Sequence, residues 1–232
     1  MARDGSAWKI VGIGCLVVAV VGVGVTIGAG VFLYRQAKKI EAEMKDPDAR
    51  TARARRILGT STIPDGYHAM LALSVPLLGD LAILSSRAPN AQGEIHELGE
   101  RGLIYLQFIR SGEVESELRD YCEGKTTDPA VLRRNKIKVD PAEVIGRGVV
   151  PLRGGTLLYV AQRGSVATHG FHGEGVTAIT MIDCPGDERL RAAIWFGPDG
   201  PAAPDGGPPD LTGTPADERA LAEFLGQFEF CR

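Results

Sequence analysis

The chain of 232 residues is long enough for one ordinary domain with an appendage. Hydrophobic residues make up 44% and charged residues 24%, values typical of a globular protein, which excludes disorder throughout. The formal net charge is −3, but residues 57–232 hold 24 acidic against 16 basic side chains. Because nucleic-acid binding draws its affinity from basic patches, we expect no nucleic-acid partner.

A long apolar segment follows the short polar tail of residues 1–9. Residues 10–34 contain no charged side chain over 25 positions, enough for a helix that spans a bilayer. Trp8 and Tyr34 flank this segment, as aromatic rings do at the headgroup level. The sequence therefore predicts a single transmembrane helix over 10–34, with the lipid bilayer as a partner. A cleaved signal peptide is the alternative, although its apolar region is usually shorter.

The glycines of this segment allow two further interpretations. Gly22, Gly24 and Gly28 do not have the G-x-G-x-x-G spacing of a dinucleotide-binding turn, and both flanks are apolar. Gly24 and Gly28 do have the G-x-x-x-G spacing that lets two membrane helices approach closely. This pair is our candidate for helix association and a homodimer; ordinary glycine use in a membrane helix is the alternative.

The next segment, residues 35–56, is a basic juxtamembrane stalk with eight Lys and Arg against four Asp and Glu. We expect helix on both sides of Pro47, with a break at Asp46. This stalk is either solvated, which we favour, or in contact with anionic headgroups.

A soluble domain is expected over residues 57–232. A turn at 63–67 precedes apolar runs that predict strands at 68–75, 80–86 and 103–109. A helical period follows over 113–123, with Cys122 on its apolar face, and a proline-started helix is predicted at 140–144. Further strands are predicted at 156–162, 175–183 and 190–196, the last two as an antiparallel hairpin.

The end of the domain is expected to be a loop and a helix. Residues 197–213 are rich in Gly and Pro and predict a long loop. Thr214 and Pro215 are expected to start a helix whose apolar side packs on the sheet. The fold class is therefore α+β: a transmembrane helix followed by a mainly antiparallel sheet domain with packed helices, including a C-terminal amphipathic helix.

The side of the membrane that holds this domain is indicated by two opposing signals. Six Lys and Arg follow the span within twenty residues and two precede it, which favours a cytoplasmic domain. Cys184 and the penultimate residue Cys231 would form a disulfide that holds the chain end, as oxidising compartments allow. Cys122 is expected to be a buried thiol. We favour the exported side of the cell membrane.

Catalytic signals are sparse. His169, His172 and Glu174 supply two imidazoles and a carboxylate within six residues, a combination that suits zinc or another first-row metal. A glycine-rich hairpin loop with solvated polar residues is the other interpretation. G-x-S-x-G, C-x-x-C and P-loop motifs do not occur, and we expect no cofactor.

The resulting functional hypothesis is a membrane-anchored, non-catalytic domain that binds a protein or small-molecule partner. The alternative is a metal-dependent hydrolase that uses the three residues at 169, 172 and 174. A thiol-redox role for Cys184 or Cys231 is a third possibility.

Overall fold

The computed structural model describes residues 46–232, except 76–78, 90–98, 128–137, 169–170 and 203–206, and these residues belong to one compact unit. The polar tail, the expected transmembrane helix of residues 10–34, the first part of the stalk, and Gly24 and Gly28 lie outside the described residues. No helix within the described part is both long enough and apolar enough to cross a membrane.

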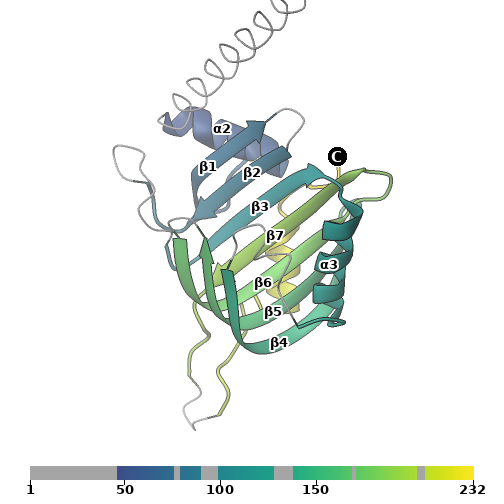
Figure 1. Cartoon of the computed structure of the whole chain (residues 1–232). Coiled ribbons are helices and arrows are strands. Elements are labelled where there is room, and N and C mark those ends of the chain that lie inside the picture. The colour runs from purple at the N-terminus through teal and green to yellow at the C-terminus, as the bar shows by residue number, and fades with distance from the viewer. Residues whose placement is uncertain (1–45, 76–78, 90–98, 128–137, 169–170, 203–206) are drawn as a thin grey trace, which may run out of the picture. The chain divides into compact units, whose positions relative to one another are not determined.

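Seven strands in the described part of the chain form one antiparallel sheet, in the order β1-β2-β3-β7-β6-β5-β4 (Figure 1). They are β1 (His68–Val75), β2 (Gly79–Ser85), β3 (Gly102–Ile109), β4 (Lys138–Leu152), β5 (Gly155–Thr168), β6 (Phe171–Asp183) and β7 (Arg189–Gly197). The sheet consists of two meanders, β1 to β3 and β4 to β7, which are joined where β3 pairs with β7. The connection from β3 to β4 therefore crosses to the far edge of the sheet.

Three helices accompany the sheet in the described residues: α2 (Pro47–Leu58), α3 (Gly112–Glu123) and α5 (Glu218–Leu225). Asp46 caps α2 by accepting hydrogen bonds from two backbone amides of its first turn, and Gly59 ends this helix with φ +67°. A side chain at Gly59 would also lie 2.4 Å from the carbonyl oxygen of Glu229, which leaves room only for glycine.

One face of the sheet is covered by α2, α5 and the C-terminal segment. Leu58 of α2 and Leu221 of α5 are fully buried in the same cluster as Leu84 and Leu103 of the sheet. Trp195 of β7 stacks on Phe224 of α5 with ring centroids 4.5 Å apart. The apolar side of the C-terminal helix thus packs on the sheet, as its sequence predicts.

The opposite face of the sheet carries α3, which lies in front of the strands in Figure 1. Leu118, Tyr121 and Cys122 of this helix are buried against the sheet residues Ile179 and Met181. Helical spacing therefore predicted this interface correctly. The expected α+β class with a mainly antiparallel sheet is confirmed.

The helix predicted at 140–144 is wrong, because this segment belongs to β4. Pro141 lies in β4 beside a shift of register, and a second shift follows between Val144 and Gly146. β4 is an edge strand, which is where a sheet tolerates proline. Long-range pairing with β5 therefore overrides a local sequence pattern that is typical of a helix start.

Two other boundaries also differ from expectation. The C-terminal helix begins at Glu218 with Asp217 as its cap, because Thr214 and Pro215 form a preceding turn. The second part of the stalk is not a solvated segment: Arg50 of α2 is 3% exposed and donates from Nε to the carbonyl oxygen of Ala69 at 2.8 Å. The folded part of the chain therefore begins about one helix earlier than residue 57.

Candidate functional site

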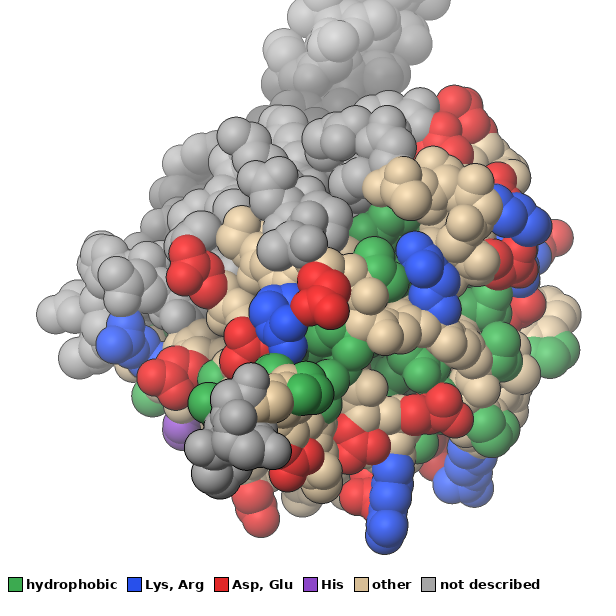
Figure 2. Space-filling view, turned by 90° about the horizontal axis from the view of Figure 1, so that it is seen from below, with side chains coloured by type: hydrophobic (Ala, Val, Ile, Leu, Met, Phe, Trp, Pro, Cys, Tyr) green, Lys and Arg blue, Asp and Glu red, His purple; other side chains and the backbone are tan. Residues whose placement is uncertain are grey.

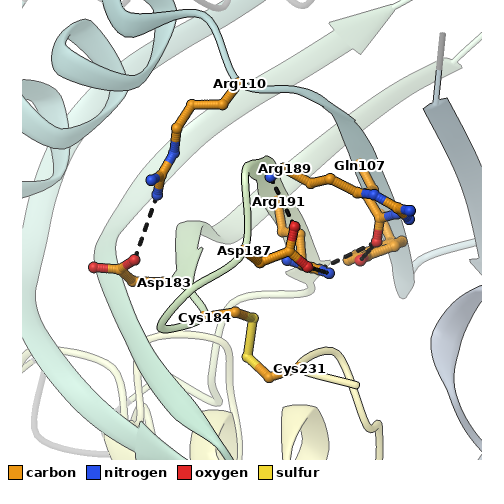
Figure 3. Close-up of a disulfide and its surroundings, with 9 residues drawn as sticks. Gln107, Arg110, Asp183, Cys184, Asp187, Arg189, Arg191 and Cys231 are labelled. Atoms are coloured by element: carbon orange, nitrogen blue, oxygen red, sulfur yellow. Dashed lines mark hydrogen bonds and ion pairs between the residues drawn. A yellow bond between two sulfur atoms is a disulfide. The ribbon is translucent and has the colours of Figure 1, made fainter. Parts of the chain in front are cut away.

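A pocket of about 620 Å³ opens at one end of the sheet, a volume typical of ligand sites. Its walls come from the end of β3, the turn between β4 and β5, the turn between β6 and β7, and the last two residues of the chain. Four segments distant in sequence therefore meet around this space. Figure 3 shows its central part.

The Cys184–Cys231 disulfide forms one wall of this pocket (Figure 3). Its two Cα atoms are 5.3 Å apart, and 47 positions separate the cysteines in the sequence. Gly155 makes the close approach of the chain end possible, because a Cβ there would lie 2.7 Å from Cys231 Sγ. The disulfide thus holds the C-terminal segment against the turn that follows β6.

A buried arginine lies behind the Asp187 carboxylate that lines the pocket. Arg191 of β7 is 2% exposed, donates from Nε to Gln107 Oε1 at 3.1 Å, and pairs from Nη2 with Asp187 Oδ2 at 2.5 Å. Gln107 in turn accepts from the Tyr105 hydroxyl at 3.0 Å and donates to Asp80 at 3.2 Å. The Arg191 Nη1 atom has no hydrogen-bond partner in the described part of the chain.

Asp187 is held in its charged form. Burial alone would raise its pKa, but the hydrogen bond from the Arg191 guanidinium and that from the Arg189 backbone N–H outweigh burial and lower the pKa below the ordinary value. The Asp187 carboxylate therefore neutralises Arg191 instead of presenting a free negative charge to the pocket.

The other charged groups around the pocket differ in how they are paired. Arg189 is exposed and makes no ion pair with a described residue, and Glu188 is exposed as well. The Arg232 guanidinium donates to the carbonyl oxygens of Arg56 and Ile57 at the end of α2. Neither guanidinium group thus forms an ion pair in direct contact with a carboxylate of the described chain, although the Arg189 charge helps to lower the pKa of Asp187.

Ion pairs connect the same end of the sheet to α3. Asp183, which precedes Cys184, pairs with Arg110 at 3.6 Å and with Arg119 at 3.4 Å. Both arginines also pair with Glu115, at 2.8 and 3.3 Å. These partly exposed ion pairs connect α3 to the end of β6, and they give both Asp183 and Glu115 positively charged partners.

Two of the three predicted metal-ligand residues, His172 and Glu174, lie at the other end of the β5–β6 hairpin. His169 falls outside the described residues, while the backbone of His172 is paired with Ala167 inside β6. Glu174 is an exposed residue of β6. Residues 171–174 are thus strand and not loop, and no cluster of three His, Cys, Asp or Glu side chains suited to a metal occurs among the described residues.

The face seen from below in Figure 2 carries acidic and basic side chains interspersed with hydrophobic ones. The described part of this face therefore presents no continuous surface of one charge.

Cys122 is a buried free thiol, as expected from its place on the apolar side of its helix. Burial raises the pKa of this thiol to about 12. Because the thiolate is the reactive form, we expect Cys122 in the native domain to react with iodoacetamide at pH 8 roughly a thousandfold more slowly than in the unfolded domain. Mass spectrometry of labelled domain comprising residues 44–232 measures this ratio, and rapid native labelling would contradict the prediction.

The sequence pointed to the two cysteines of this site but not to its polar network. One feature of the sequence could have indicated this network: Arg191 is a charged residue within the otherwise apolar strand of residues 190–196. A charge in a strand that is buried on both faces requires a buried partner. Its partner Gln107 is 84 positions away, so that local pattern could not identify it.

The sequence matches no protein-family model, and no curated protein matches it either.

Proposed function

We propose that this protein is a membrane-anchored binding domain, tethered by residues 10–34, which binds its ligand in the pocket beside the Cys184–Cys231 disulfide. The observation that carries this proposal is the pocket itself: about 620 Å³ in volume and built from four separate segments. Its tether is inferred from the 25 uncharged residues near the start of the chain.

The chemistry of the pocket favours binding over catalysis. Arginine side chains stay protonated at physiological pH and so serve as fixed positive charges. Asp187 is held by Arg191 and by the Arg189 backbone, and the two disulfide sulfurs do not titrate. Groups of this kind hold a ligand through charge and shape, which supports a non-catalytic role.

The disulfide also supports placing the domain on the exported side. Disulfides form and persist in oxidising compartments and are rare in the cytosol. The excess of Lys and Arg after the apolar segment favours the opposite orientation. We give more weight to the disulfide, because the Cα atoms of Cys184 and Cys231 are 5.3 Å apart, a separation usual for disulfides.

Both parts of the anchoring proposal can be tested on the full chain. We expect it to remain in the membrane fraction after an alkaline carbonate wash and to dissolve only in detergent. An alkaline phosphatase reporter at the C-terminus should be active, because this enzyme folds only outside the cytosol. Release by carbonate would contradict the anchor, and an inactive but expressed reporter would contradict the orientation.

The metal-dependent hydrolase remains the competing hypothesis and has its own test. Metal analysis of the purified domain and of a variant with His169→Ala and His172→Ala decides it. A stoichiometric metal that is lost in the variant would replace the binding-domain proposal.

A further inference from the structure

We propose that β1, at one edge of the sheet, pairs antiparallel with β1 of a second copy of this chain, so that two domains share one continuous sheet. This contact goes beyond the binding function proposed above and uses a different surface from the glycine pair of the apolar segment. It is carried by the unprotected edge of β1, by the order of its side chains, and by the contrast with β4 at the opposite edge.

The two edge strands of the sheet differ in how they are protected. β1 and β4 stand at the two ends of the strand order, so each has one edge without a partner strand in the described part of the chain (Figure 1). Unpaired N–H and C=O groups along such an edge are a template for another strand, and proteins usually protect them with charged residues, prolines or bulges. The pairing of β4 with β5 has two shifts of register. The sequence of β4 also holds six charged or proline residues: Lys138, Asp140, Pro141, Glu143, Arg147 and Pro151.

β1 has few of these devices. Its sequence, HAMLALSV, contains no Lys, Arg, Asp, Glu or Pro. The shift of register in β1 lies near its start, between Ala69 and Leu71, and there Arg50 Nε donates to the carbonyl oxygen of Ala69 at 2.8 Å. Residues 71–75 then pair regularly with β2 and carry no charge. The second part of β1 is therefore a regular and uncharged strand edge, which suits a pairing strand.

The order of the side chains in residues 71–75 favours a second copy of the same segment. With a two-fold axis through Leu73, this residue lies opposite its own copy, and Leu71 lies opposite Val75 of the partner subunit. These side chains are half-buried and lie on the α3 side of the sheet, since Leu71 and Leu73 pair with Ile83 and Leu81 of the cluster on that side. Every apolar side chain thus gains an apolar partner, and no like charges meet.

The other face of the paired strands carries small side chains. In the same register Ala72 lies opposite Ser74 of the partner subunit, so that no bulky side chains meet on the side of α2. A pair of such short strands is a small interface, and we expect the isolated domain to dimerise weakly and reversibly. A shared bilayer would raise the effective concentration of the two chains.

The first test is a cross-link in the full chain at Leu73, in a background with Cys122→Ala. Residues directly opposite each other in an antiparallel pair have Cβ atoms about 5 Å apart, near the separation of a disulfide. We expect Leu73→Cys to give a covalent dimer after mild oxidation with copper phenanthroline, seen on a non-reducing gel and reversed by a reducing agent.

Two control variants make this cross-link specific. Leu71→Cys should give little covalent dimer, because the proposed register puts residue 71 about 13 Å along the strand from its own copy. Val149→Cys should also give little, although Val149 is a 58% exposed apolar residue of the other edge strand. It is the matched control for random collisions between domains.

The second test uses the domain of residues 44–232, which forms a compact unit with its own core and lacks the apolar segment. Sedimentation velocity should show a reversible dimer whose fraction rises with protein concentration. Leu73→Lys should weaken this dimer at least about tenfold, because two lysines then face each other across the two-fold axis. Val149→Lys should leave it unchanged. Thermal unfolding checks that both variants fold, and the cross-link at Leu73 tests the same contact without adding a charge.

Three results would overturn the pairing. Equal cross-linking of Leu73→Cys and Val149→Cys would show random collision, and cross-linking of Leu71→Cys instead of Leu73→Cys would contradict the register. A domain that stays monomeric at millimolar concentration, together with no cross-link at residue 73 in the full chain, would leave the edge of β1 to a strand of a different protein. Failure of the membrane anchor is a separate result, because carbonate extraction measures it and the isolated domain does not contain it.

Discussion

The domain of residues 44–232 with Cys184→Ala and Cys231→Ala is expected to unfold with a free energy about 4 kcal/mol lower than that of the unchanged domain. The physical reason is the freedom that the unfolded chain gains when a cross-link between residues 47 positions apart is removed. For a domain of this size, the melting temperature should fall by roughly 12 °C. Urea unfolding and thermal unfolding measured by circular dichroism check both values.

The control for this result is Cys122→Ala, which removes the free thiol and keeps the disulfide. Adding a reducing agent to the Cys122→Ala domain should lower its stability as the double replacement does, because both remove the same cross-link. Hydrogen exchange should also become faster at Phe228 and Phe230, which are 3% exposed and precede Cys231. An unchanged melting temperature after loss of the disulfide would show that packing of the C-terminal segment suffices without it.

Replacing Arg191 by alanine is expected to lower the free energy of unfolding by about 4 kcal/mol. The change removes a side chain that is 2% exposed and leaves Gln107 and Asp187 without their charged donor. Urea unfolding of the variant measures the loss. The double variant Arg191→Met with Asp187→Asn should recover much of it, because it replaces the charged pair by a neutral one of similar volume. No recovery would show that the packing of Arg191, and not its charge, is what stabilises the domain.

The same ion pair gives a pH dependence of stability. The folded-state pKa of Asp187 lies below its value in the unfolded chain, so this residue contributes stability that is fully present above the unfolded pKa. That contribution is lost as the pH falls through the lower, folded pKa. The unfolding free energy of the unchanged domain should therefore fall more steeply between about pH 5 and pH 2 than that of Asp187→Asn. Parallel curves would contradict the role given to Asp187.

Much of the local structure could be predicted from the sequence. The strand at 68–75 has the predicted bounds, and the helix predicted at 113–123 begins one residue earlier, at Gly112. Alternating or helical spacing of apolar residues was sufficient in these places because one face of each element is buried. The segment 140–144 was misread, since a proline and a glutamate are equally suited to a helix start and to a bulged edge strand.

The candidate site could be predicted only in part. Cys184 and Cys231 were paired on the basis of their positions, and the structure brings them together. The pocket beside them and the charges of Arg189 and Arg232 could not be inferred, because the lining residues belong to different segments. Of the predicted metal ligands, His172 and Glu174 are placed at the opposite end of a long hairpin from this pocket.

The sequence by itself therefore determined the α+β class, most strands and helices, the disulfide partners and the acidic character of the domain. Apart from the disulfide, whose partners were inferred from the number and positions of the cysteines, these properties depend on composition and on spacing within about ten residues, where local sterics and one-sided burial act. Only the tertiary structure decided that β3 pairs with β7, that α2 belongs to the core, and that Arg191 is buried beside Gln107. The reason is that such contacts join residues far apart in the chain, and their free energy depends on how the whole sheet packs.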